Sequence, residues 1–172
     1  MACIALVGYR ACGKTTIGQR VAAQLGLRFV DLDAVIETRL GEPISRFFAT
    51  HGEAAFRQIE EEQLKLVLEN PHNLVLSTGG GCVLREENRC ILREKTTIVI
   101  YVNVAAEILQ ERLTLNDGDR PSLTGSRVAD EVPRVLSQRE PLYRAVAQQV
   151  VDGNGPLTDV TAAIVAIVEN LG

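Results

Sequence analysis

Residues 8–16 read GYRACGKTT, which matches the phosphate-binding loop G-x-x-x-x-G-K-[ST] at every fixed position. The apolar run at residues 3–7 predicts a buried strand before the loop, and apolar residues at helical spacing predict a helix after it. The glycines allow a turn in which backbone N–H groups face one anion at the start of that helix. The plainer alternative is an ordinary strand–helix turn with a surface lysine. We interpret the stretch as a nucleoside triphosphate site, with Lys14 reaching the outer phosphates and Thr15 binding Mg²⁺.

Length and composition narrow the class of protein. The chain has 172 residues, which suits one domain over 1–172 with a substantial core. Its net charge is −4 and it has no basic run, so we expect no nucleic-acid partner. It shows neither a membrane-length apolar stretch nor the pattern of a signal peptide, so we expect a cytoplasmic protein without membrane contact. The four cysteines form no C-x-x-C pair and are interpreted as reduced thiols.

Strand and helix patterns alternate along the rest of the chain. Strands are expected at 28–31, 74–77, 96–104 and 149–152, and helices at 32–40, 51–70, 86–93, 105–115, 128–147 and 157–171, with a short helix or turn at 44–49. This alternation predicts an α/β fold, in which a five-stranded parallel sheet has helices on both faces. Residues 116–127 are polar, contain three glycines or prolines and lack periodicity, so we expect a mobile lid there.

Polar and glycine residues follow the predicted strands at the edge where parallel sheets bind ligands. Asp31 and Asp33 end the second strand, and residues 79–81 are three consecutive glycines after the third. Asp31 is expected to hold Mg²⁺ through its waters, and Asp33 to accept a hydrogen bond and a proton from an acceptor hydroxyl. The alternatives are solvated turn acids or helix caps for the aspartates, and a flexible turn for the glycines.

Three arginines have positions that suit phosphoryl transfer, which needs cations around the transferred group. Arg57 precedes Glu60 by three residues on a predicted helix, so a same-face ion pair is possible. Arg120 lies in the predicted lid and could approach only when substrate is bound. Arg139 lies in a helical stretch with an internal proline. Each could instead be a surface charge.

Taken in order along nearly the whole chain, these motifs resemble the shikimate kinase family. The resemblance rests on the phosphate loop, Asp31-x-Asp33, Gly52-Glu53 followed by Phe56-Arg57 and Glu60, the glycines 79–81, Arg120-Pro121 and Arg139-x-Pro-Leu-Tyr. It implies a three-layer P-loop kinase fold with a mobile lid. It also implies ATP-dependent phosphorylation of the 3-hydroxyl of shikimate to 3-phosphoshikimate, on the route to chorismate and the aromatic amino acids.

The resemblance also implies a set of site residues. ATP would contact Ala11, Cys12, Gly13, Lys14, Thr15, Thr16, Arg112 and Arg120, and Mg²⁺ would contact Thr15 and Asp31. Shikimate would contact Asp33, Arg57, Gly79, Gly80, Gly81 and Arg139, between walls formed by Phe48 and Phe56. Lys14, Asp33 and Arg120 would be the catalytic residues. ATP and shikimate would be the only partners, and the chain would be a monomer.

Three other functions share parts of this pattern. A gluconate kinase has the same loop and lid but need not carry the three glycines or this arginine set. A nucleoside monophosphate kinase lacks the context of the two aspartates. A regulatory GTP switch would recognise guanine with Asn-Lys-x-Asp, which the sequence does not contain. Cys12 could be a reactive thiol beside Lys14 or could simply fill space.

Overall fold

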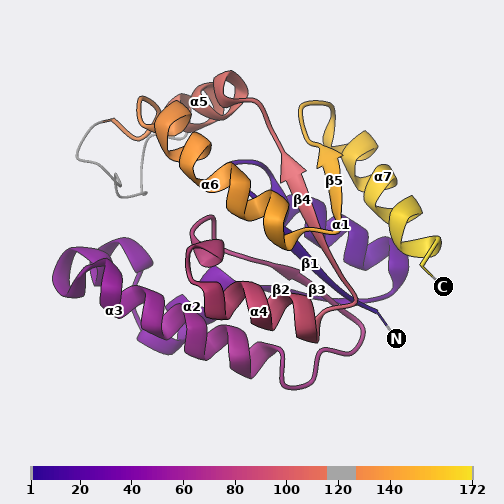
Figure 1. Ribbon diagram of the computed structural model, residues 1–172, viewed down its shortest axis with the longest axis horizontal. Coiled ribbons are helices and arrows are strands. Elements are labelled where there is room, and N and C mark those ends of the chain that lie inside the picture. Colours follow the sequence, from indigo (N-terminus) through magenta and orange to yellow (C-terminus); the bar gives the residue numbers. More distant parts are fainter. Residues whose placement is uncertain (1, 116–126, 172) are drawn as a thin grey trace.

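The computed structural model describes residues 2–115 and 127–171, and within them five strands form one parallel sheet (Figure 1). The strands are β1 (Cys3–Val7), β2 (Arg28–Asp31), β3 (Leu74–Ser77), β4 (Ile98–Asn103) and β5 (Gln149–Asp152). Their order is β2-β3-β1-β4-β5, and every neighbouring pair is parallel. The predicted α/β class and five-stranded parallel sheet are therefore confirmed. Arg120 and all but the last residue of the predicted lid lie outside the described residues.

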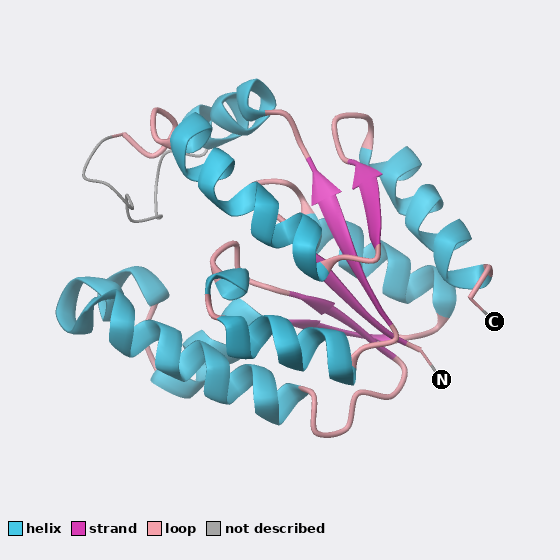
Figure 2. Cartoon of the chain, in the orientation of Figure 1, coloured by secondary structure: helices cyan, strands magenta, loops and turns pink. Residues whose placement is uncertain are grey.

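Helices cover both faces of this sheet (Figure 2). They are α1 (Lys14–Leu25), α2 (Leu32–Leu40), α3 (Ile44–Val67), α4 (Glu86–Lys95), α5 (Ala106–Leu115), α6 (Val132–Val146) and α7 (Leu157–Glu169), with a short 3₁₀ turn η1 (Cys82–Leu84). Helix α1 packs against α7, while α4 packs against α6 on the other side of the sheet (Figure 1). Among the described residues, no helix combines the length and apolarity needed to cross a membrane.

The central strand β1 delivers the phosphate loop. All five of its residues are buried, as expected for a strand with neighbours on both sides and helices on both faces. The chain then turns through Gly13, whose φ of 96° is left-handed, and α1 begins at the next residue. Ala11 in the same loop also has a positive φ of 64°, which costs a non-glycine residue energy and is typical of ligand-binding loops. The predicted strand–loop–helix arrangement is confirmed.

Helix α3 joins two helical segments that the sequence predicted separately. We expected a short element at 44–49 and a helix from 51 to 70, and α3 (Ile44–Val67) consists of two helical segments that meet at a kink at Gly52. Gly52 adopts φ 81° and ψ 174°, angles that no helical residue has, so the break falls at the glycine rather than before residue 51. The break separates the part of α3 that carries Phe48 from the part that carries Arg57.

Strand β4 and helix α6 both begin later than predicted, because the residues before them make other hydrogen bonds. Strand β4 begins at Ile98, two residues late, because Thr96 donates its hydroxyl to the carbonyl of Leu92 and closes α4. Helix α6 begins at Val132 rather than at 128, because the residues before it form turns, in which the amide of Glu131 donates to the carbonyl of Arg127.

The β4–β5 end of the sheet is closely packed at Gly153, so Gly153→Ala should destabilise the fold. A Cβ built there would lie 2.7 Å from Cγ2 of Val104 and 2.8 Å from Cγ1 of Val102, and both valines are buried. Overpacking of this kind lowers the free energy of unfolding by about 1–3 kcal/mol, measurable by urea denaturation. The matched control is Gly155→Ala, whose Cβ would meet nothing within 4 Å. Equal free energies of unfolding of the two variants would show that Val102 and Val104 can move aside without cost.

Candidate active site

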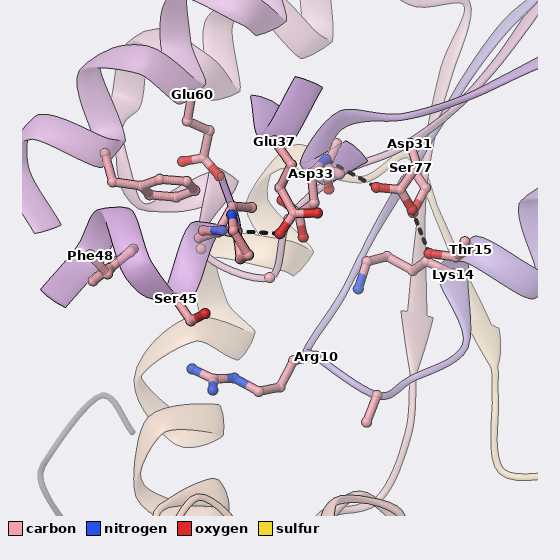
Figure 3. Close-up of a pocket in the computed structure, with 18 of the residues that line it drawn as sticks. Arg10, Lys14, Thr15, Asp31, Asp33, Glu37, Ser45, Phe48, Glu60 and Ser77 are labelled. Carbon is pink, nitrogen blue, oxygen red and sulfur yellow. Dashed lines mark hydrogen bonds between the residues drawn. The ribbon is translucent and has the colours of Figure 1, made fainter. Parts of the chain in front are cut away.

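One cavity of about 950 Å³ opens at the carboxyl edge of the sheet (Figure 3). The phosphate loop, Asp31, Asp33 and the three glycines 79–81 all line it, as the positions of the strand ends predicted. The cavity is also lined by Arg57, Arg112 and Arg139, which come from three different helices. Of the predicted site residues, Arg120 lies outside the described residues, and Cys12 is buried beneath the loop rather than lining the cavity.

Lys14 is bonded to its own loop. Its Nζ donates to the carbonyls of Gly8 at 2.8 Å and Tyr9 at 2.9 Å, and lies 3.4 Å from Sγ of Cys12. Only 7% of Lys14 is exposed. The ammonium therefore sits inside the turn that would receive phosphates, close to where it would be needed. Cys12 is fully buried in this packing, which favours the interpretation that it fills space.

Thr15 and Asp31 converge at the foot of the loop (Figure 3). The Thr15 hydroxyl donates to Oδ2 of Asp31 at 2.6 Å, while Oδ1 accepts from the amides of Asp33 and Ala34. Asp31 is thus a helix cap, which was the alternative interpretation of this aspartate, and it is also a hydrogen-bond partner of Thr15. Among the described residues, no cluster of three or more histidine, cysteine or acidic side chains could enclose a metal. One carboxylate and one hydroxyl do fit Mg²⁺, which takes few protein ligands and completes its shell with waters and phosphates.

The three glycines let charged side chains approach the backbone closely. A Cβ built on Gly79 would lie 2.8 Å from Oδ1 of Asp33, and one built on Gly81 would overlap the guanidinium of Arg57. The carbonyl of Gly80 accepts a hydrogen bond from the hydroxyl of Tyr143 at 2.5 Å. The turn is therefore a fixed surface held against three side chains, and not a flexible connector.

Arg57 is held in place by two glutamates. Its Nη1 donates to Oε2 of Glu60 at 2.8 Å, and its Nε and Nη2 donate to Oε1 of Glu53 at 3.3 and 3.2 Å. The predicted Arg57–Glu60 pair is confirmed, and it is not a solvated surface pair, since only 11% of the Arg57 side chain is exposed. Burial raises the pKa of Glu60, against the opposing effect of Arg57. Oε1 of Glu60 has no hydrogen-bond partner among the described residues and faces Gly79.

The remaining cations of the cavity come from the second half of the chain. Arg139 is buried on α6, and Arg112 of α5 donates to the carbonyl of Ala11 at 3.2 Å. Arg112 is far from the loop in sequence, but the fold places both beside the same cavity.

Several lining residues carried no signal in the sequence. Arg10 and Ser45 line the cavity, as does Glu37, which accepts a hydrogen bond from the amide of Ile44 at 3.0 Å. Arg10 occupies a position at which the phosphate-loop motif allows any residue. Ser45 and Glu37 lie on helical stretches without a recognisable motif, so only the fold brings them to the site.

Comparison with known proteins identifies the relatives of this fold and site. The family model described as "Shikimate kinase" matches residues 10–169. The chain belongs to the shikimate kinase family. A shikimate kinase of Nitratidesulfovibrio vulgaris is 41% identical over 164 residues, which cover 94% of this chain and 93% of that one. Shikimate kinase from Acinetobacter baumannii, solved in complex with shikimate, superposes with a TM-score of 0.91 at 32% identity, covering 99% of this chain and 94% of that one.

A gluconokinase from Sinorhizobium meliloti is also similar in structure, with a TM-score of 0.65 and 18% identity over 99% of this chain and 93% of that one. At that identity the likeness shows a shared fold alone. The family membership confirms the resemblance drawn from the phosphate loop, the paired aspartates, the three glycines and the arginines.

Alanine substitutions at two of the three glycines should have different effects, one on kcat and the other on binding of the acceptor. Gly79→Ala should push the Asp33 carboxylate aside and lower kcat, whereas Gly81→Ala should displace Arg57 and weaken binding of the acceptor. Because the displaced atoms end flexible side chains, both proteins should fold, and each effect should be about tenfold or more, the loss of one charged hydrogen bond. Steady-state kinetics and calorimetry measure the two quantities. With Gly155→Ala as the control, identical kinetic profiles of the two variants would contradict this division.

Proposed function

We propose that this cavity transfers the γ-phosphoryl group of ATP to the 3-hydroxyl of shikimate, giving 3-phosphoshikimate and ADP. As a member of the shikimate kinase family, the chain is a kinase that phosphorylates shikimate with ATP. One observation carries the detailed assignment. Asp33 lines the same cavity as the phosphate loop and the glutamate-held Arg57, close to Gly79 and Glu60.

The loop end of the cavity would bind the triphosphate. Backbone N–H groups of Ala11, Cys12, Gly13 and Thr16 would face the phosphate oxygens. Lys14 would exchange its loop carbonyls for the outer phosphates, and Arg112 would lie beside the base. Thr15 and Asp31 would hold Mg²⁺, which would neutralise part of the phosphate charge when bound. Arg120 would add a cation to the transferred group.

The opposite end would bind the acceptor. Arg57 and Arg139 would take the carboxylate of shikimate, because a guanidinium matches a carboxylate with two parallel hydrogen bonds. The backbone of residues 79–81 would contact the ring hydroxyls, and Phe48 and Phe56 would pack on the ring. Asp33 would accept the proton of the 3-hydroxyl while that oxygen attacks phosphorus and ADP leaves.

We further propose that the enzyme works as a single-domain monomer in the cytoplasm. Every group named above comes from one chain, so the assigned roles need no residue of a second copy.

An ADP-release assay with alternative acceptors tests the proposed function. The purified chain, with ATP and Mg²⁺, should release ADP with shikimate and far more slowly with gluconate or AMP. The product should be phosphorylated at the 3-hydroxyl, which phosphorus and proton NMR can establish. Faster turnover of gluconate than of shikimate would contradict the substrate assignment.

Removing the Arg139 guanidinium should weaken shikimate binding much more than ATP binding. For Arg139→Ala we expect a loss of about tenfold to a hundredfold in shikimate affinity, the usual effect of removing a charged hydrogen bond. Arg139→Lys should recover little, because an ammonium lacks the planar fork. The control is Arg134→Ala on the exposed face of the same helix. Calorimetry with each ligand separately would contradict the assignment if both affinities fell equally.

Asp33→Asn should lower kcat while leaving shikimate binding nearly intact. The amide can still hydrogen-bond the acceptor hydroxyl but cannot take its proton, and loss of a general base costs roughly 10²–10⁴-fold in rate. Steady-state kinetics at saturating ATP measures the effect. A variant with wild-type kcat would assign proton removal to another group or to the phosphate itself.

A further inference from the structure

Arg10 is an arginine of the cavity that the roles above leave unused. It lies in the phosphate loop, two residues after Gly8, and it lines the cavity. Figure 3 shows its side chain extending from the loop toward the side where Ser45 and Phe48 lie, while Lys14 of the same loop lies on the other side with Thr15. Only 14% of the Arg10 side chain is exposed. A charge buried to this extent is costly unless nearby polar or oppositely charged groups stabilise it.

Glu131 is one of the groups that stabilise the charge of Arg10. Its Oε1 lies 3.8 Å from Nη2 of Arg10, and its side chain is 0% exposed. Glu131 stands immediately before α6, the helix that carries Arg139. A buried carboxylate is costly unless it is paired, so Glu131 and Arg10 restrain one another.

The same construction occurs at Arg57. That arginine is paired with Glu60, whose side chain is also 0% exposed. In both cases a guanidinium with five N–H donors is held by a carboxylate that cannot reach solvent. The restraint fixes the direction of each guanidinium before a ligand arrives, which lowers the entropy lost on binding.

Two observations place Arg10 beside the acceptor end of the cavity. A Cβ built on Gly80 would lie 3.0 Å from the backbone nitrogen of Arg10, so the loop packs directly on the glycine turn. Arg10, Arg139 and Glu131 all act on the nearby Tyr9 hydroxyl. Burial raises the pKa of Tyr9, the two arginines oppose that rise, and Glu131 adds to it. Arg10 and Arg139 also line the same cavity, and Glu131, which lies beside Arg10, immediately precedes the helix that carries Arg139.

We propose that Arg10 is a specificity-determining residue that contacts the carboxylate of the acceptor together with Arg139, and that Glu131 is its positioning residue. This inference rests on the proposed function and adds a third arginine to the acceptor end. The side chain extends away from Lys14 and the metal-binding residues, so an acceptor anion is a better match than the nucleotide phosphates. The three arginines would together select acidic acceptors over neutral sugars.

The test compares a charged ligand with a neutral one. In Arg10→Met the side chain keeps its approximate length and loses its charge. Calorimetry on the full chain would use shikimate, an analogue with a hydroxymethyl group in place of the carboxylate, and ATP. Shikimate affinity should fall about tenfold or more, as expected for a charged hydrogen bond. Affinity for the neutral analogue and for ATP should change by less than about twofold. The control is Arg46→Met, whose side chain is 77% exposed outside the cavity.

Glu131→Gln tests the positioning role. It should reproduce the selective loss for shikimate over the neutral analogue, to a smaller extent, because the guanidinium remains but is less restrained. If this variant does not fold, the Arg10→Met comparison alone decides the inference.

Equal losses for both acceptors, no loss, or a loss mainly in ATP affinity would each overturn it. Wild-type protein that failed to phosphorylate shikimate would refute the proposed function itself. Normal wild-type turnover with unchanged shikimate binding by Arg10→Met would overturn only this inference.

Discussion

The carbonyl of Leu6 joins the two halves of the site. It accepts hydrogen bonds from the amide of Thr78 at 3.1 Å and from the Thr78 hydroxyl at 2.9 Å. Leu6 stands two residues before the phosphate loop begins, and Thr78 immediately precedes the three glycines. These two bonds continue the parallel register of β1 and β3 beyond the end of β3. A slip of one residue would turn the buried side chains of β3 to the opposite face, so the packing of the core also fixes the distance between the phosphate loop and the glycine turn.

Two arginines of the cavity lie beside carboxylates. Arg57 lies between Glu53 and Glu60, and Arg10 lies beside Glu131. Such pairs contribute little net stability, because the cost of removing charges from water offsets most of their attraction. What they provide is orientation, since a guanidinium that is already fixed loses less entropy when an anionic ligand binds. Burial of the apolar core supplies the free energy that offsets the cost of keeping these charges in fixed, buried positions.

The sequence was sufficient to predict most of the fold and the loop-side residues. The glycines, Lys14 and Thr15 stand in a contiguous motif, and apolar periodicity placed the strands whose ends bring Asp31 and Asp33 to the loop. Arg10 and Glu131 could not be predicted in the same way. One fills a position where the motif accepts any residue, and the other lies 121 residues away, with a role that exists only after folding. The break in α3 was misplaced because periodicity continues through Gly52 and only backbone angles reveal the interruption.

The hydrogen bonds of Lys14 affect ligand binding, because carbonyl oxygens of the loop and oxygens of a ligand are alternative partners of its ammonium group. The ammonium donates hydrogen bonds to two carbonyl oxygens of the turn, and so the loop contains its own cation. Binding of a polyphosphate is then an exchange of one set of oxygen ligands for another, and the measured affinity reports the difference between them. Since two carbonyl oxygens have to be replaced, this exchange favours ligands that present several oxygens at once, before any part of the base or the acceptor is recognised.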